Sequence, residues 1–170
     1  MTGVLLVGGA SSRFGSPKAL ARLDGETLAD RAWRTLGQVC DERLAVGKAA
    51  DGLALPFPLV DDGSDVRAPL AGVVAGLRAA THAVCVFLPV DCPLVSADAL
   101  RRLAAAAPAH PQLGPLPGAY PVALLPALER KLEHGDYSLR DVDATVVELD
   151  ERELANVNTP TDLDALRRTT

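Results

Sequence analysis

Aromatic residues and cysteines are both scarce in this 170-residue chain. Phe, Trp and Tyr make up 4% of it, so the core must be built from Leu, Val and Ala. The three cysteines are Cys40, Cys85 and Cys92. Their number is odd and no two form a CxxC pair, which argues against a disulfide framework and against a zinc site. A reducing cytoplasm is therefore the expected compartment.

The chain also lacks an excess of positive charge and a long apolar run. It carries 17 Lys and Arg against 22 Asp and Glu, a formal net charge of −5, and no stretch is dense in cations. This argues against a nucleic-acid-binding surface, although a small anionic substrate needs only a few local cations. No apolar run approaches the ~20 residues of a membrane span, and the N-terminus lacks the features of a signal peptide. We therefore expect a protein that binds neither nucleic acid nor membranes.

Apolar runs predict the strands of the fold. Residues 3–7 (GVLLV) and 83–88 (AVCVFL) are apolar on both faces, as buried strands of a parallel sheet are. Weaker strand candidates lie at 43–47, 57–60, 119–125 and 144–149. The chain length is typical of one domain.

Helix signals lie between these runs. Thr27 can cap a helix whose apolar residues share one face, namely Leu28, Ala32, Trp33 and Leu36. Further helices are indicated over 69–80 behind Pro69, after Ser96, over 126–134 and after Thr159-Pro160. This alternation predicts an α/β protein with three layers, α/β/α, and a mostly parallel sheet. The proline-rich stretch 105–118 predicts a loop or a partly mobile lid.

The segment that follows the first strand has a composition suited to phosphate. Gly8 and Gly9 come directly after the strand, so the backbone can turn and approach a ligand without a Cβ in the way. Arg13 and Lys18 can neutralise phosphate oxygens beside free N–H groups. The spacing matches neither GxGxxG nor GxxxxGK[ST], which argues against the Rossmann and Walker fingerprints. The alternative is a mobile surface loop with two solvated cations.

An acidic residue ends the second strong strand, in FLPVDCPLV at 87–95. Pro93 favours an extended Cys92, so Asp91 is expected at the strand end, facing the cleft where parallel sheets bind ligands. A lone carboxylate there suits Mg²⁺, which keeps most of its waters. The alternative is a turn-forming Asp before a proline. For Cys92 itself, the expected role is to fill space in the core.

Two further polar pairs are candidates for binding. Asp61 and Asp62 end a short strand, where they could accept hydrogen bonds from a nucleobase or ribose or could form a solvated turn. Asn156 and Asn158 precede a helix start, where they could order metal-bound water or could form a turn. The three histidines are scattered, and no serine lies in a G-x-S-x-G elbow, so a triad hydrolase gets no support.

Taken together, these motifs resemble a known family. LVGGASSRFGSPKAL is similar to the L-x-G-G-x-S-x-R-x-G-x-x-K signature of small nucleotidyltransferases. PLAG at 69–72, DCP at 91–93 and NVNTP at 156–160 resemble segments of the molybdenum cofactor guanylyltransferases (the molybdopterin-guanine dinucleotide biosynthesis protein A family). The resemblance runs in order from residue 3 to about 168. It implies a Rossmann-like fold of the nucleotide-diphospho-sugar transferase type.

The resemblance also implies an activity and its site. The activity is Mg²⁺-dependent transfer of GMP from GTP to molybdopterin, with release of pyrophosphate. The residues assigned to the nucleotide are Leu6, Val7, Gly8, Gly9, Arg13, Lys18, Asp62 and Asp91. Of these, Arg13 and Lys18 would bind phosphates and Asp91 would hold the metal, so these three would carry catalysis. Asp62 would contact the guanosine part.

The acceptor side follows from the same resemblance. Asn156 and Asn158 lie in the family's C-terminal motif, nearer the pterin. The implied single nucleotidyltransferase domain spans 1–170, with a nucleotide-binding half over about 1–100 and an acceptor-binding half over about 101–170. Partner proteins that deliver the cofactor and accept the product are also implied.

This chain departs from the family pattern at three places. Gly47 stands where an Asn is frequent, Ala68 stands where Gly usually precedes PLAG, and the region 104–120 is shorter than usual. Alternative functions are a cytidylyltransferase or sugar-phosphate nucleotidyltransferase of the same fold, and a non-catalytic guanine-nucleotide-binding regulatory domain. Gly8-Gly9 favours guanine over cytosine, and the joint presence of Arg13, Lys18 and Asp91 favours an enzyme.

Overall fold

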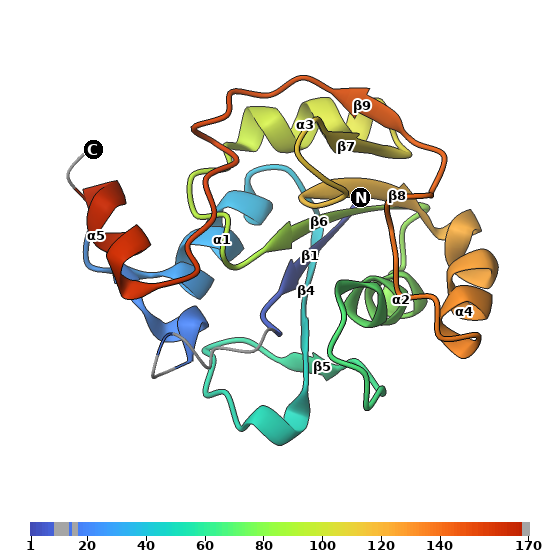
Figure 1. Cartoon of the computed structure of the whole chain (residues 1–170), viewed down its shortest axis with the longest axis horizontal. Coiled ribbons are helices and arrows are strands. Elements are labelled where there is room, and N and C mark those ends of the chain that lie inside the picture. The colour runs from blue at the N-terminus through green and yellow to red at the C-terminus, as the bar shows by residue number, and fades with distance from the viewer. Residues whose placement is uncertain (9–13, 15–16, 168–170) are drawn as a thin grey trace.

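A seven-stranded sheet forms the centre of the molecule, with strand order β5-β4-β1-β6-β8-β7-β9 (Figure 1). The computed structural model describes residues 1–8, 14 and 17–167. Four neighbouring strands run parallel: β5 (Leu59–Asp61), β4 (Glu42–Gly47), β1 (Thr2–Leu6) and β6 (Val84–Pro89). Every residue of β1 is buried, as expected for a strand that lies at the centre of a sheet and is covered on both faces.

The remaining three strands extend the sheet beyond β6. β8 (Gly118–Pro121) pairs antiparallel to β6, and β7 (Ala109–Pro111) pairs antiparallel to β8. β9 (Thr145–Val147) is the edge strand and runs parallel to β7. A separate two-stranded hairpin consists of β2 (Arg22–Leu23) and β3 (Glu26–Thr27). The prediction of a mostly parallel α/β sheet is therefore confirmed.

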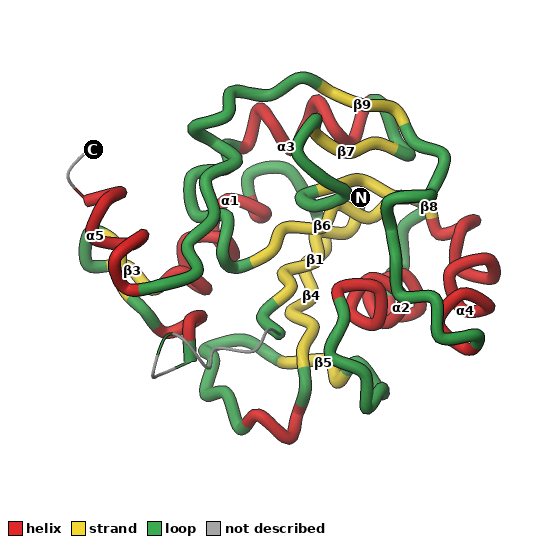
Figure 2. The backbone as a smooth tube through the Cα atoms, in the orientation of Figure 1, coloured by secondary structure: helices red, strands yellow, loops and turns green. Residues whose placement is uncertain are grey.

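One face of the sheet packs against α1 (Leu28–Gly37) and α3 (Ala97–Ala105), with α5 (Pro160–Arg167) beyond them (Figures 1 and 2). The caps predicted for α1 and α3 are present. The Thr27 hydroxyl accepts from the Asp30 N–H at 3.0 Å, and Ser96 accepts from the Ala99 N–H at 3.1 Å. Because a capping oxygen satisfies an otherwise unpaired donor, both helices begin where their sequences predict.

The other face packs against α2 (Pro69–Ala79) and α4 (Leu125–Glu133), which completes the three layers (Figure 1). Alternate residues of β1 serve the two sides: Leu5 packs with the α1 layer, whereas Val4 and Leu6 pack with the α2 layer. Within the described part of the chain, no helix combines the length and the apolar character that a membrane span requires.

The prediction of a loop over residues 105–118 is wrong in its middle. Ala109 is fully buried and pairs with Ala119 of β8 and Thr145 of β9, so the segment contributes β7 to the sheet. Pro111 ends this three-residue strand, where a missing N–H disrupts little pairing. The strand expected at 119–125 is also shorter: β8 ends at Pro121 and a 3₁₀ turn, η4 (Val122–Leu124), follows.

Candidate functional site

The carboxyl ends of the four parallel strands meet at one edge of the sheet. Leu6 is in register with Val46 of β4 and Pro89 of β6, and Gly47 is in register with Asp61 of β5. Backbone hydrogen bonds continue this alignment past the strands, from the Val7 N–H to Val46 O at 3.0 Å and from the Val90 N–H to Leu6 O at 3.0 Å. The segments that follow the strands therefore lie side by side at the edge where open parallel sheets bind ligands.

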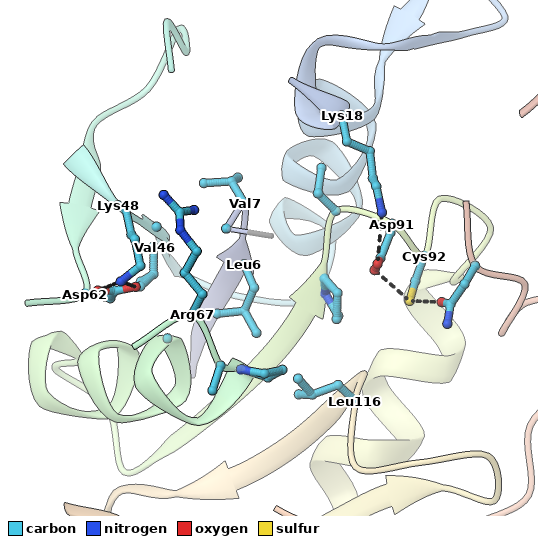
Figure 3. Close-up of a pocket in the computed structure, with 18 residues that line it drawn as sticks. Leu6, Val7, Lys18, Val46, Lys48, Asp62, Arg67, Asp91, Cys92 and Leu116 are labelled. Atoms are coloured by element: carbon cyan, nitrogen blue, oxygen red, sulfur yellow. Dashed lines mark hydrogen bonds and ion pairs between the residues drawn. The ribbon is translucent and has the colours of Figure 1, made fainter. Parts of the chain in front are cut away.

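A cavity of about 340 Å³ lies at this edge. Leu6, Val7 and Gly8 line it, and Figure 3 shows Lys18 and Asp91 to one side of Leu6 and Val7 and Lys48 and Asp62 to the other. The first turn of α2 contributes Ala68, Pro69 and Gly72 to the wall. This turn brings the positive end of the helix dipole to the cavity.

Lys18 and Asp91 come together at one end of the cavity. Lys18 begins the short 3₁₀ turn η2 (Lys18–Leu20), and its Nζ lies 3.4 Å from Asp91 Oδ2, although 73 positions separate the two residues. The same Nζ donates to Asn158 Oδ1 at 3.1 Å. Lys18 is 16% exposed and Asp91 31%, and both line the cavity, so a ligand there can reach the pair.

The segment around Asn156 lies directly against Asp91. The Val157 N–H donates to Asp91 O at 2.8 Å, and the Cys92 thiol donates to Asn156 Oδ1 at 3.0 Å. Burial raises the pKa of the Cys92 thiol far above its ordinary value, and the neighbouring Asp91 carboxylate raises it further. The thiol therefore stays protonated and serves as a buried donor, not as a nucleophile.

A second ion pair lies at the opposite end, and its cation is one that the sequence analysis missed. Lys48 Nζ lies 3.0 Å from Asp62 Oδ1 and 3.2 Å from Oδ2. The Arg67 guanidinium lines the same end and binds Asp51 through both carboxylate oxygens, at 2.6 and 3.1 Å. The parallel pairing of β4 with β5 is the signal that could have found Lys48, because it sets the residues after Gly47 and Asp61 side by side.

The two adjacent aspartates have different surroundings. Asp62 lines the cavity, whereas Asp61 accepts from the backbone N–H groups of Ala49 at 2.6 Å and Gly63 at 2.7 Å. These bonds lower the pKa of Asp61. Asp61 therefore holds the turn together, and Asp62 is the member of the pair that can meet a ligand.

The structure brings most of the predicted site residues to one place. Those that line the cavity are Leu6, Val7, Gly8, Lys18, Asp62, Asp91 and Asn156, and Asn158 adjoins it through its bond to Lys18. Gly9 and Arg13 lie outside the described residues. At Gly47, where the family pattern favours Asn, the backbone lines the wall and the next residue, Lys48, supplies the polar side chain.

Comparisons with known proteins show which family the chain resembles. Residues 3–151 match the family described as MobA-like NTP transferase domain. A probable molybdenum cofactor guanylyltransferase from Rhodopirellula baltica is 35% identical, over 96% of this chain and 90% of the relative. Another, from Deinococcus radiodurans, is 36% identical over 98% and 93% of the two chains.

Solved structures show the same fold. The molybdopterin-guanine dinucleotide biosynthesis protein A from Archaeoglobus fulgidus superposes with a TM-score of 0.79 at 23% identity, covering 99% of this chain and 98% of that one. The 2-C-methyl-D-erythritol 4-phosphate cytidylyltransferase from Thermus thermophilus superposes with a TM-score of 0.70 at 18% identity, covering 98% and 97%. Both proteins thus share the architecture of this chain.

Proposed function

The chain belongs to the MobA-like NTP transferase family, and from this premise we propose that it transfers GMP from GTP to the phosphate of molybdopterin, giving the guanine dinucleotide form and pyrophosphate. The observation that carries the proposal is the contact between Lys18 and Asp91 at one end of the cavity. A cation and a lone carboxylate at the strand ends suit the phosphates of a nucleotide and the metal that accompanies them. The curated relatives named above support guanine as the base.

The reaction we propose is a direct in-line displacement. A phosphate oxygen of molybdopterin forms a bond to the α-phosphorus of GTP, and the bond from that phosphorus to the bridging oxygen breaks, so that pyrophosphate leaves with the electron pair. The acceptor phosphate is already ionised at neutral pH, and no protein nucleophile is needed. This agrees with the burial of the Cys92 thiol, which raises its pKa.

Charge repulsion between two anions is the main obstacle to this step. Lys18 would offset it from the side of the triphosphate, and Arg13 would do so from the segment outside the described residues. Gly8 and Gly9 would let the main chain approach the phosphates. Preorganised positive charge of this kind stabilises the negative charge that develops in the transition state. Removing one such contact typically lowers the rate by about 10²–10³-fold.

The residues around Asp91 suit a magnesium ion. The Lys18 ammonium already lies among oxygen atoms of Asp91 and Asn158, so this position accommodates a cation among hard ligands. The described residues hold no group of three or more His, Cys, Asp or Glu that could bind a metal by themselves. Mg²⁺ needs only one or two carboxylates beside substrate phosphates and water. When bound at Asp91, it would supply Lewis-acid stabilisation of phosphate charge.

The acceptor would approach from the side of the C-terminal segment. Asn156 lines the cavity next to Cys92, and Asn158 adjoins it, so both lie where a second substrate can contact them. We assign the nucleotide to the half formed by about residues 1–100 and the acceptor to the half formed by about 101–170. Proteins that deliver molybdopterin and accept the product complete the proposed set of partners.

A transfer assay tests the proposal. Purified protein is incubated with Mg²⁺, molybdopterin and either GTP or CTP, and both pyrophosphate and the dinucleotide product are measured. We expect both products with GTP and neither without the acceptor. Preferential use of CTP would indicate a cytidylyltransferase. Tight binding of GTP without any release of pyrophosphate would indicate a regulatory nucleotide-binding domain, and either outcome would overturn the proposal.

A further inference from the structure

The ion pair between Lys48 and Asp62 differs from the other ion pairs of the described residues in its burial. The two side chains are 12% and 9% exposed, and both line the cavity, at the end away from Lys18 and Asp91 (Figure 3). Taking both charges out of water is costly, so a buried pair adds little to stability compared with apolar residues of the same volume. Its place in the cavity wall therefore points to a role in the site.

The Lys48 ammonium is held by two groups of the protein. It has three protons and no acceptor. Among the described residues it contacts Asp62 Oδ1 at 3.0 Å, Asp62 Oδ2 at 3.2 Å, and the backbone carbonyl of Ser64. These contacts hold the ammonium against the Asp62 carboxylate and the Ser64 carbonyl, both of which belong to the protein.

The Asp62 carboxylate, in contrast, retains the capacity to accept. A carboxylate offers about four lone-pair sites. Asp62 Oδ1 accepts from Lys48 and from the Ser64 N–H at 3.0 Å, whereas Oδ2 accepts only from Lys48 among the described residues. The side chain is held at both oxygens, so its orientation is fixed before any ligand arrives. Oδ2 is the atom that has a site open for a hydrogen bond from the ligand.

Lys48 also changes the charge at this end of the cavity. An unpaired carboxylate in the cavity wall would repel a nucleotide that carries several negative charges. The adjacent ammonium cancels that charge and leaves the hydrogen-bonding capacity. The pair therefore presents a neutral, oriented acceptor, which suits the uncharged nucleoside part of the substrate and not its phosphates.

We propose that Lys48 is a positioning residue that holds Asp62 so that it accepts an N–H or O–H of the nucleoside. This inference rests on the proposed function, because it requires a nucleotide in the cavity. The donor is either an N–H of the base or a hydroxyl of the ribose, since a carboxylate accepts from both. Lys48 does not touch the ligand and acts through Asp62.

A double-mutant cycle tests this role. Dissociation constants for GTP and for inorganic tripolyphosphate are measured with Lys48→Met, Asp62→Asn and the double variant. We expect each single change to weaken GTP about tenfold, or about 1.4 kcal/mol. The double variant should bind GTP no more weakly than the worse single variant, because the two residues act as one unit. Tripolyphosphate should bind to the double variant as it does to the wild type.

The controls separate a site role from a structural one. Lys131 pairs with two more exposed carboxylates, Asp136 and Asp141, away from the cavity lining, so Lys131→Met removes a lysine–aspartate contact outside the cavity and should leave GTP affinity unchanged. If Lys48→Met alone does not fold, the double variant still gives an answer, because it contains no orphaned charge. Its GTP affinity should then equal that of Asp62→Asn.

Distinct results overturn the inference. Additive losses of GTP affinity, or an equal loss of tripolyphosphate affinity in the double variant, would make Lys48 an independent phosphate-binding cation. Comparing GTP with inosine triphosphate and with 2′- and 3′-deoxy-GTP tells whether the base or the ribose is the donor. Asp62→Asn should not weaken binding of the analogue that lacks the donor group. If all these analogues are affected as GTP is, Asp62 accepts from the guanine N1–H, which all of them keep. Failure of the wild type to bind GTP would refute the proposed function itself.

Discussion

Gly8→Ala separates the stability of the fold from the binding of a ligand at the cavity. Among the described residues, the nearest atom to a Cβ added at Gly8 is Gly47 Cα, at 3.7 Å, which is an ordinary van der Waals contact. Gly8 has no positive φ, so alanine fits its backbone. A glycine-to-alanine change at such a position raises stability by about 0.4–1 kcal/mol, because it restricts the unfolded chain.

The same methyl group is expected to weaken nucleotide binding. Gly8 lines the cavity beside Leu6 and Val7, where we propose that phosphates approach the main chain. A methyl group forced into a packed contact is destabilising by about 1–3 kcal/mol, which corresponds to a roughly 5- to 150-fold rise in dissociation constant. Stability and affinity should therefore change in opposite directions.

Isothermal titration calorimetry with GTP and Mg²⁺, paired with urea unfolding, measures both quantities on the same sample. Gly114→Ala is the matched control, because an added Cβ there meets nothing within 4 Å and Gly114 is not among the residues that line the cavity. Wild-type GTP affinity in Gly8→Ala would refute the close approach of the ligand to the main chain. A large loss of stability would refute the packing argument.

Three further predictions concern catalysis, packing and pH. Lys18→Ala and Asp91→Ala should each lower GMP transfer about a hundredfold in the pyrophosphate assay with the melting temperature little changed, and near-normal turnover would reject their roles. Gly76→Ala should lower the free energy of unfolding by about 1–3 kcal/mol, since its Cβ would lie 2.8 Å from Phe87 Cε1; equal urea midpoints for mutant and wild type would contradict this. The pKa of Glu42 is lowered to about 2, chiefly by the Thr2 hydroxyl. The contribution of Glu42 to the free energy of unfolding should therefore be complete above the ordinary pKa of 4.5 and should be lost as the pH drops toward 2. Glu42→Gln should reduce the dependence of unfolding free energy on pH between 4.5 and 2. The same pH dependence in the variant and the wild type would contradict this role of Glu42.

The parts of the fold that local chemistry determines could be predicted from the sequence. β1 was expected at residues 3–7 and spans Thr2–Leu6, because a run that is apolar on both faces has few other ways to be buried. The starts of α1 and α3 were predicted from Thr27 and Ser96, whose hydroxyls cap the next turn.

The parts that depend on distant residues could not be predicted. β7 contains only three residues, and its pairings are with Ala119 and Thr145, so nothing within 105–118 distinguishes it from a loop. Lys48 was missed for a related reason: after Gly47 it reads as one solvated cation. Its partner becomes evident only when β4 and β5 are known to be parallel neighbours.

A crystal structure of the protein with GTP and Mg²⁺ tests the central claim most directly. We predict that the triphosphate contacts Lys18, that Asp91 holds the metal, and that the nucleoside reaches the end of the cavity formed by Lys48 and Asp62. A nucleotide bound in the reverse direction, or outside this cavity, would contradict the account.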